Sequence, residues 1–159
     1  MARARKIPGL EGEITFSEAA ARTVEIRAQE IFSFADGVLD TSNPERVHDM
    51  RVATRRLRAA LEIFAPCFPK SEHKELLREV KKLADALGER RDPDVQIDAL
   101  LTLKAELGQG ERAGVNGLVA EIRARQARGN ELVEAAIEHV GELGLEQRLI
   151  ALAQGAVPS

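Results

Sequence analysis

Apolar residues recur along this 159-residue chain at intervals of three and four positions, the spacing that gathers them on one side of an α-helix. Thr15 and Glu18 fit a capping box at the start of the first such stretch. Asn43 and Pro44 fit an N-cap followed by the first helical position of the second. The pattern predicts an all-α helical bundle of about six helices, at about 16–40, 44–65, 71–88, 93–107, 111–140 and 145–154.

Breaks between these stretches carry turn-forming residues. One helix is expected to be capped near Ser71 and to end around Gly88. Residues 89–91 then form a link, and Asp92-Pro93 begins the next helix. Residues 12–16 are too short and isolated to form a sheet. The chain is therefore expected to form a single α-helical domain over 16–155, preceded by a flexible basic N-terminal arm over 1–15.

Composition supports packed helices and adds a prediction of location. Hydrophobic residues make up 44% of the chain, without Trp or Tyr and with five Phe, which is typical of a core built from Leu and Ala. The longest uncharged stretches are too short to cross a bilayer, and no apolar region follows the basic start to make a secretory signal. The single cysteine, Cys67, cannot form an internal disulfide and is read as a small apolar filler. A cytoplasmic protein is expected.

Charge is distributed unevenly along the chain. Residues 46–91 hold twelve Lys or Arg against seven Asp or Glu, a net charge of +5, within a chain whose net charge is −3. The remaining residues therefore carry a net charge of −8. Such polarity would attract an anion to one part of the molecule.

The helix predicted at 44–65 places its basic residues on one side. At 100° per residue His48, Arg51, Arg55 and Arg58 occupy one arc of about 80°, beside an apolar stripe. Like charges three and four positions apart destabilise an isolated helix. An anionic partner would explain why this row is present.

The helix predicted at 71–88 repeats the design. Lys74, Arg78 and Lys81 share one face, with Lys82 beside them. If the two helices pack antiparallel, their basic rows can border a common groove that ends at Arg90 and Arg91, and arginine forks in it would match phosphate oxygens. The competing interpretation is that these basic residues form an ordinary solvent-exposed helix face, with neighbouring Asp and Glu residues balancing their charge. Nucleic acid is a poor fit, because aromatic residues for base stacking are nearly absent.

Two segments resemble the CHAD family, the conserved histidine α-helical domain. Val47-His-Asp-Met-Arg-Val-Ala-Thr-Arg-Arg-Leu-Arg58 resembles its V-H-x-x-R-V-x-x-R-R-L-R pattern, and residues 81–95 resemble its K-x-L-x-x-x-L-G-x-x-R-D-x-D-V segment. The resemblance implies a helical domain that binds inorganic polyphosphate through basic side chains. Carried onto this chain, its motif residues are His48, Arg51, Arg55, Arg56, Arg58, Lys81, Lys82 and Arg91. Arg56 falls outside the arc that the other residues of its helix share.

This chain departs from the family in carrying the basic motif once. Members of the family are commonly longer, with two similar halves whose basic faces enclose a channel. The chain thus resembles a first half or a shortened member. Either a second copy completes the channel as a homodimer, or the groove stays open.

Catalytic and metal-binding patterns do not emerge from the sequence. His48, His73 and His139 are too scattered for a metal cluster, and a protonated His48 among phosphates is the simpler role. Asp49, Glu62 and Asp85 are read as salt-bridge partners rather than as acid–base groups or Mg²⁺ ligands.

We therefore expect a polyphosphate-binding protein associated with polyphosphate granules, with no enzymatic activity, no cofactor and no metal. The alternatives are a helical scaffold that docks an acidic protein and a phosphohydrolase. The predicted binding residues are His48, Arg51, Arg55, Arg56, Arg58, Arg78, Lys81, Lys82, Arg90 and Arg91.

Overall fold

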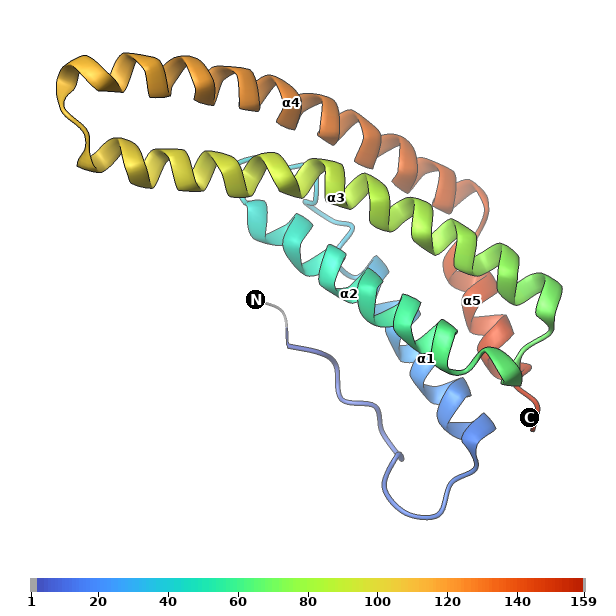
Figure 1. Cartoon of the computed structure of the whole chain (residues 1–159). Coiled ribbons are helices and arrows are strands. Elements are labelled where there is room, and N and C mark those ends of the chain that lie inside the picture. Colours follow the sequence, from blue (N-terminus) through green and yellow to red (C-terminus); the bar gives the residue numbers. More distant parts are fainter. Residues whose placement is uncertain (1–2, 159) are drawn as a thin grey trace.

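The computed structural model describes residues 3–158, which form five α-helices and one 3-10 turn and contain no strand (Figure 1). This architecture confirms the predicted all-α bundle. The elements in chain order are α1 (Phe16–Phe32), α2 (Pro44–Ile63), η1 (Ala65–Cys67), α3 (Lys70–Glu106), α4 (Gln109–Glu142) and α5 (Leu145–Gln154).

The first helix starts as predicted but ends earlier. The Thr15 hydroxyl accepts a hydrogen bond from the Glu18 N–H at 3.2 Å, and the Glu18 carboxylate accepts one from the Thr15 N–H at 2.8 Å, so the capping box is confirmed. α1 stops at Phe32 rather than at residue 40. The Ser33 hydroxyl donates to the Glu30 carbonyl at 2.7 Å, and Gly37 adopts a left-handed φ of 74°, which a helix does not allow.

The second helix also begins where the sequence predicts. Pro44 lies in its first turn, where its missing N–H costs no helical hydrogen bond. Asn43 occupies the N-cap position, but its side chain makes no capping hydrogen bond.

One long helix, α3, replaces the two that the sequence predicts over 71–88 and 93–107. It begins at Lys70 after Pro69, so the cap expected at Ser71 is wrong, and it continues through Gly88 and Pro93. The predicted break at residues 89–92 is therefore wrong as well. Pro93 has no N–H to donate to the Glu89 carbonyl, so packing from outside the helix must stabilise this turn.

Contacts with α4 supply that packing. A Cβ atom at Gly129 would lie 2.9 Å from the Arg90 Cα and 3.0 Å from the Glu89 carbonyl oxygen, so only glycine lets the two backbones approach this closely. The fully buried Arg90 forms an ion pair with Asp94 and donates to Asn130 Oδ1 at 2.9 Å. These interactions stabilise α3 as one continuous helix through a segment whose local sequence predicts a helix end.

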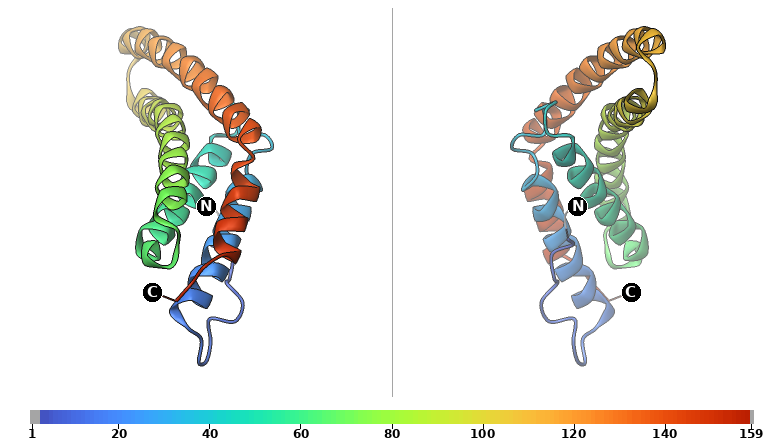
Figure 2. Two further views of the ribbon diagram at one scale, coloured as in Figure 1. Left: turned by 90° about the vertical axis from the view of Figure 1, so that its right-hand side faces the viewer. Right: turned by 90° about the vertical axis from the view of Figure 1, so that its left-hand side faces the viewer.

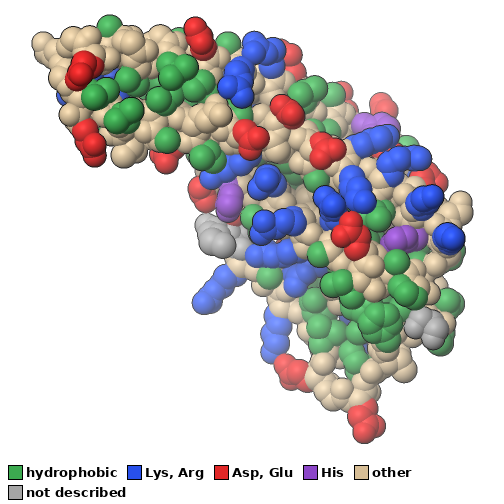
Figure 3. Space-filling model, viewed as in Figure 1, with side chains coloured by type: hydrophobic (Ala, Val, Ile, Leu, Met, Phe, Trp, Pro, Cys, Tyr) green, Lys and Arg blue, Asp and Glu red, His purple; other side chains and the backbone are tan. Residues whose placement is uncertain are grey.

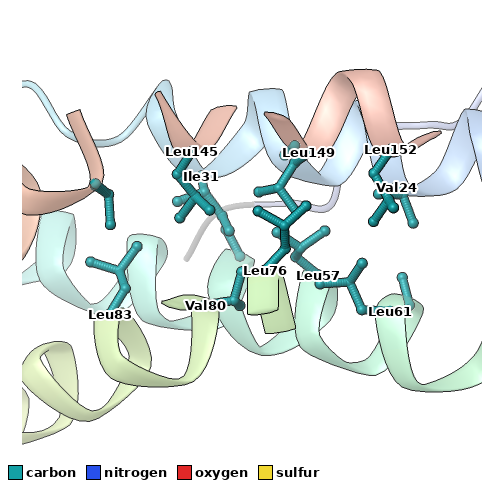
Figure 4. Packing of buried hydrophobic residues seen from close by; sticks show 14 of the residues in the cluster. Val24, Ile31, Leu57, Leu61, Leu76, Val80, Leu83, Leu145, Leu149 and Leu152 are labelled. Atoms are coloured by element: carbon teal, nitrogen blue, oxygen red, sulfur yellow. The ribbon is translucent and has the colours of Figure 1, made fainter. Parts of the chain in front are cut away.

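The hydrophobic core lies mainly among α1, α2, the first half of α3 and α5, and the second half of α4 adds Val133 and Val140. Figures 1 and 2 show how these helices are arranged. α1 packs against both α2 and α5, while α3 packs against α2 and α4. Figure 4 shows side chains from α1, α2, α3 and α5 meeting, among them Val24, Ile31, Leu57, Leu61, Leu76, Val80, Leu83, Leu145, Leu149 and Leu152.

Beyond this core, α3 and α4 continue as an antiparallel hairpin that projects from the bundle (Figure 1). The hairpin has its own small apolar cluster of Ile97, Val119 and Ile122. The part of α3 that is relevant to binding is the half that stays with the bundle.

α2 and α3 run antiparallel through the turn at η1, as the groove hypothesis requires (Figure 1). Cys67 is buried in that turn, where burial raises the pKa of its thiol above the usual value. Its position agrees with the role of apolar filler. The Val157 N–H donates to the Cys67 carbonyl at 3.0 Å and so ties the chain after α5 to the same turn.

Candidate functional site

The basic row of α2 faces solvent. Arg51, Arg55 and Arg58 are exposed and His48 is half-buried, while the opposite side of the helix is buried in the core. Arg51 and Arg55 form no ion pair or hydrogen bond with any residue in the described part of the chain. Two guanidinium groups one turn apart therefore present all their N–H donors to solvent.

The basic row of α3 is exposed in the same way. Lys74 and Arg78 are exposed and Lys81 is half-buried, around a surface depression that is also lined by Ser71, Glu75 and Leu77. We use the name cationic face for the six side chains of Arg51, Arg55, Arg58, Lys74, Arg78 and Lys81.

Glu62 joins the two rows. Its Oε1 atom lies 3.1 Å from Arg58 Nε on its own helix and 3.5 Å from Lys81 Nζ on α3. The hydrogen bond from Arg58, together with the charges of Arg58 and Lys81, holds the pKa of Glu62 below its usual value, so the carboxylate is ionised at neutral pH. Figure 3 shows the result as a field of blue side chains across α2 and α3 with red side chains between them. Glu62 thus acts as the ion-pair partner that the sequence suggested.

A second carboxylate, Glu79, lies on the other side of α3. It is buried, and it receives Lys82 Nζ at 3.0 Å, Arg78 Nε at 3.5 Å and His139 Nε2 of α4 at 2.9 Å. Burial raises the pKa of Glu79, but the hydrogen bonds from Lys82 and His139 outweigh this effect and lower it below its usual value. Lys82 therefore leans toward α4 instead of toward α2.

Besides Lys82, two more of the predicted binding residues lie away from the cationic face. Arg56 points toward α1, where its Nη1 atom lies 3.5 Å from the buried carboxylate of Glu30. Arg90 is fully buried between α3 and α4, so the expectation that it ends a solvent-facing groove is wrong. The reason is that α3 does not break at residue 89, and this keeps Arg90 on the helix side that packs against α4.

Arg91 is half-buried on α3, ten residues beyond Lys81. At 1.5 Å per residue this is about 15 Å further along α3, toward the start of α2 because the helices are antiparallel. Arg91 also lies about 80° around the axis from Lys81, so the structure does not place it in the α3 row. His48 lies in the first turns of α2 and extends the α2 row at that end.

Lys74 lies in the α3 row, as the sequence pattern predicts, although it is not among the predicted binding residues. Two further charged groups come from helices that the sequence pattern does not connect with α3. His139 comes from α4, and Arg148 comes from α5, where its Nη1 atom lies 3.0 Å from Glu75 Oε1 and lowers the pKa of that carboxyl group. Neither carries a local signal, because both reach α3 only through the tertiary fold.

Residues 3–158 contain no group of three or more His, Cys, Asp or Glu placed to hold a metal ion. None of the helices in that range is both long enough and apolar enough to span a membrane.

Comparison with known proteins adds one finding to this geometry. The family model described as CHAD domain matches residues 23–159, nearly the whole chain. No curated protein matches the chain. No solved structure matches it either.

Proposed function

Because this chain belongs to the CHAD family, we propose that it binds inorganic polyphosphate on its cationic face and does not act as an enzyme. The family is known in general for polyphosphate-related binding. On this proposal the protein resides with its ligand in the cytoplasm and at polyphosphate granules.

The observation that carries the proposal is the exposed, unpaired state of Arg51 and Arg55 within a row that continues across Glu62 to Lys81. A monovalent counterion would neutralise one of these groups at a time. A linear polyanion can contact all of them at once, and it removes the repulsion between like charges that the helix otherwise tolerates.

Binding would combine two kinds of contact. The guanidinium groups of Arg51, Arg55 and Arg58 can each donate two parallel N–H hydrogen bonds to phosphate oxygens, while Lys74 and Lys81 contribute point charges. His48 would add a further positive charge in its protonated form. Condensed counterions leave the polymer as these contacts form, which makes the affinity depend on salt, as it does for nucleic-acid backbones.

The direct test is a calorimetric titration of the purified protein with long-chain polyphosphate at 50 and 200 mM salt. With the six charges of the cationic face engaged, the affinity should fall by about a thousandfold between these conditions, by analogy with proteins that make six phosphate contacts. Orthophosphate should bind far more weakly than the polymer at either concentration. Absence of binding at the lower salt concentration would contradict the proposal.

The same samples separate the two alternative functions. A scaffold that docks an acidic protein would bind an acidic polypeptide but not polyphosphate. A phosphohydrolase would release orthophosphate from the polymer in the presence of Mg²⁺, whereas a binding protein leaves the polymer intact.

A second copy of the chain is proposed to supply the opposite wall of the site. The support for this is that the cationic face is open to solvent in a single chain that carries the basic motif once. The mass of the complex in sedimentation, measured in the titration above, should correspond to two chains on one polymer. A one-to-one complex with a short polyphosphate would show instead that the open face binds alone.

Removal of the Glu62 carboxylate should strengthen polyphosphate binding. In Glu62→Gln, Arg58 and Lys81 no longer have a competing anion on the face, so we expect the affinity to rise about three- to tenfold, or roughly 1 kcal/mol. The free energy of unfolding should change by less than about 1 kcal/mol, because exposed ion pairs contribute little.

The matched control for this variant is Glu121→Gln, which removes one negative charge from the exposed surface of α4 in the hairpin. Equal increases in both variants would mean that only the net charge matters. A decrease in Glu62→Gln would mean that Glu62 orients Arg58 and Lys81 for binding.

A further inference from the structure

We propose that the segment before α1 forms a third part of the polyphosphate-binding surface, with Arg3 and Arg5 as its phosphate ligands. This inference rests on the proposed function. It concerns residues that the sequence reading assigned to a flexible arm.

The backbone of Arg5 is held at two points by α1. Its N–H donates to Glu30 Oε1 at 3.0 Å, and its carbonyl accepts from Arg27 Nη1 at 3.1 Å. Arg22, one to two turns earlier on α1, donates to the Gly9 carbonyl and fixes the segment again further along. The main chain is therefore docked, while the side chains of Arg3, Arg5 and Lys6 remain exposed.

Glu30 also connects this segment to α2. Its carboxylate is almost fully buried, and the same Oε1 atom that accepts the Arg5 N–H lies 3.5 Å from Arg56 Nη1. The segment at Arg5 is thus placed beside α2 at the level of Arg56. Arg55, a member of the cationic face, precedes Arg56 on α2 and lies about 100° away around the helix axis.

The side chains of this segment divide into two groups. They differ in whether they have an ionic partner among the described residues. Lys6 pairs with Glu11 at 3.2 Å. Arg3 and the guanidinium of Arg5 form no ion pair or hydrogen bond with the described residues.

The space-filling view agrees with this placement. Figure 3 is drawn from the same side as Figure 1, and its blue side chains continue from α2 along the path of the N-terminal segment. A polymer that leaves the cationic face near Arg55 would therefore meet further positive charge there. Because the backbone is already docked, binding costs the rotamer entropy of these side chains but little further backbone entropy.

The test compares Arg3→Ser/Arg5→Ser with Arg123→Ser/Arg128→Ser, which removes the same charge from exposed positions on the projecting hairpin. Titration uses long-chain polyphosphate and tripolyphosphate at several salt concentrations. The Arg3/Arg5 variant should lose about five- to tenfold in affinity for the long polymer. The slope of its log affinity against log salt concentration should become less negative by about two. Its affinity for tripolyphosphate should stay the same, because that anion is too short to contact the cationic face and the N-terminal segment at once.

Each outcome leads to a distinct conclusion. If the Arg3/Arg5 variant and the hairpin control bind the long polymer equally well, the inference is overturned while the proposed function stands. Equal loss of affinity for tripolyphosphate and for the long polymer would also overturn the inference. Arg3 and Arg5 would then affect binding at the cationic face itself and would not provide an additional contact for longer polymers. If the unmodified protein binds no polyphosphate, the proposed function fails and this inference fails with it. Thermal unfolding of both variants should match that of the unmodified protein, because the substituted side chains are exposed.

Discussion

Replacing Asp94 with alanine is expected to lower the free energy of unfolding by about 3–5 kcal/mol, the cost of leaving a buried charge without its partner. Arg90 is fully buried and forms its ion pair with Asp94. Gln126 of α4 also donates to the Asp94 carboxylate, at 2.6 Å, so the substitution removes the acceptor that both groups share. Urea unfolding followed by helical circular dichroism measures the change.

Asp98→Ala is the matched control, because Asp98 lies one turn further along α3 and is exposed. It should change stability by less than about 0.5 kcal/mol, as is usual for surface positions. The double variant Arg90→Met/Asp94→Leu removes both charges and should recover much of the lost stability. If Asp94→Ala and Asp98→Ala are equally stable, the buried pair does not hold α3 against α4.

The second large effect is expected on binding. The triple variant Arg51→Ala/Arg55→Ala/Arg58→Ala should lose about two orders of magnitude in affinity for long-chain polyphosphate at low salt, or roughly 1 kcal/mol for each charge-assisted contact removed. These side chains are exposed, and Arg51 and Arg55 form no ion pair or hydrogen bond with residues 3–158. Calorimetric titration gives the affinity, and the thermal unfolding midpoint should stay the same or rise slightly as repulsion along α2 is relieved.

The control is Arg112→Ala/Arg123→Ala/Arg128→Ala, which changes the net charge by the same amount on the projecting hairpin. Its affinity should stay within about threefold of the unmodified protein at 150 mM salt, where charges more than about 8 Å away are screened. Similar losses in the two triple variants would show that the polymer senses overall charge and not the cationic face.

The carboxylates within the basic region limit what can bind there. Glu62 pairs with Lys81 at the boundary between α2 and α3. Glu79 pairs with Lys82 and His139 on the α4 side and also reaches the exposed Arg78 of the cationic face. A short or singly charged anion must compete with these internal partners. On the proposed function, a long polymer would anchor first on Arg51 and Arg55, which have no such partner among residues 3–158, and then displace the weaker surface pairs. The proposal therefore predicts that long polymers bind more tightly than short anions.

Local sequence determined the start of α1, the position of Pro44 at the start of α2 and the exposed row of Arg51, Arg55 and Arg58. Each of these depends on interactions within about one turn of helix, namely capping, the fixed φ of proline and the period of 3.6 residues. The same period placed Arg56 away from that row before its partner Glu30 was known.

Tertiary structure alone decided the features that involve residues far apart in the chain. Pro93 reads locally as a helix start, yet α3 continues through it because Gly129 and Asn130 of α4 pack against Arg90. That packing buries Arg90 and removes it from the site. Likewise, only the antiparallel docking of α2 on α3 brings Arg58 and Lys81 to one oxygen of Glu62. Sequence periodicity predicts the side of its own helix on which a side chain lies. Which other helix packs against that side depends on how the whole hydrophobic core assembles.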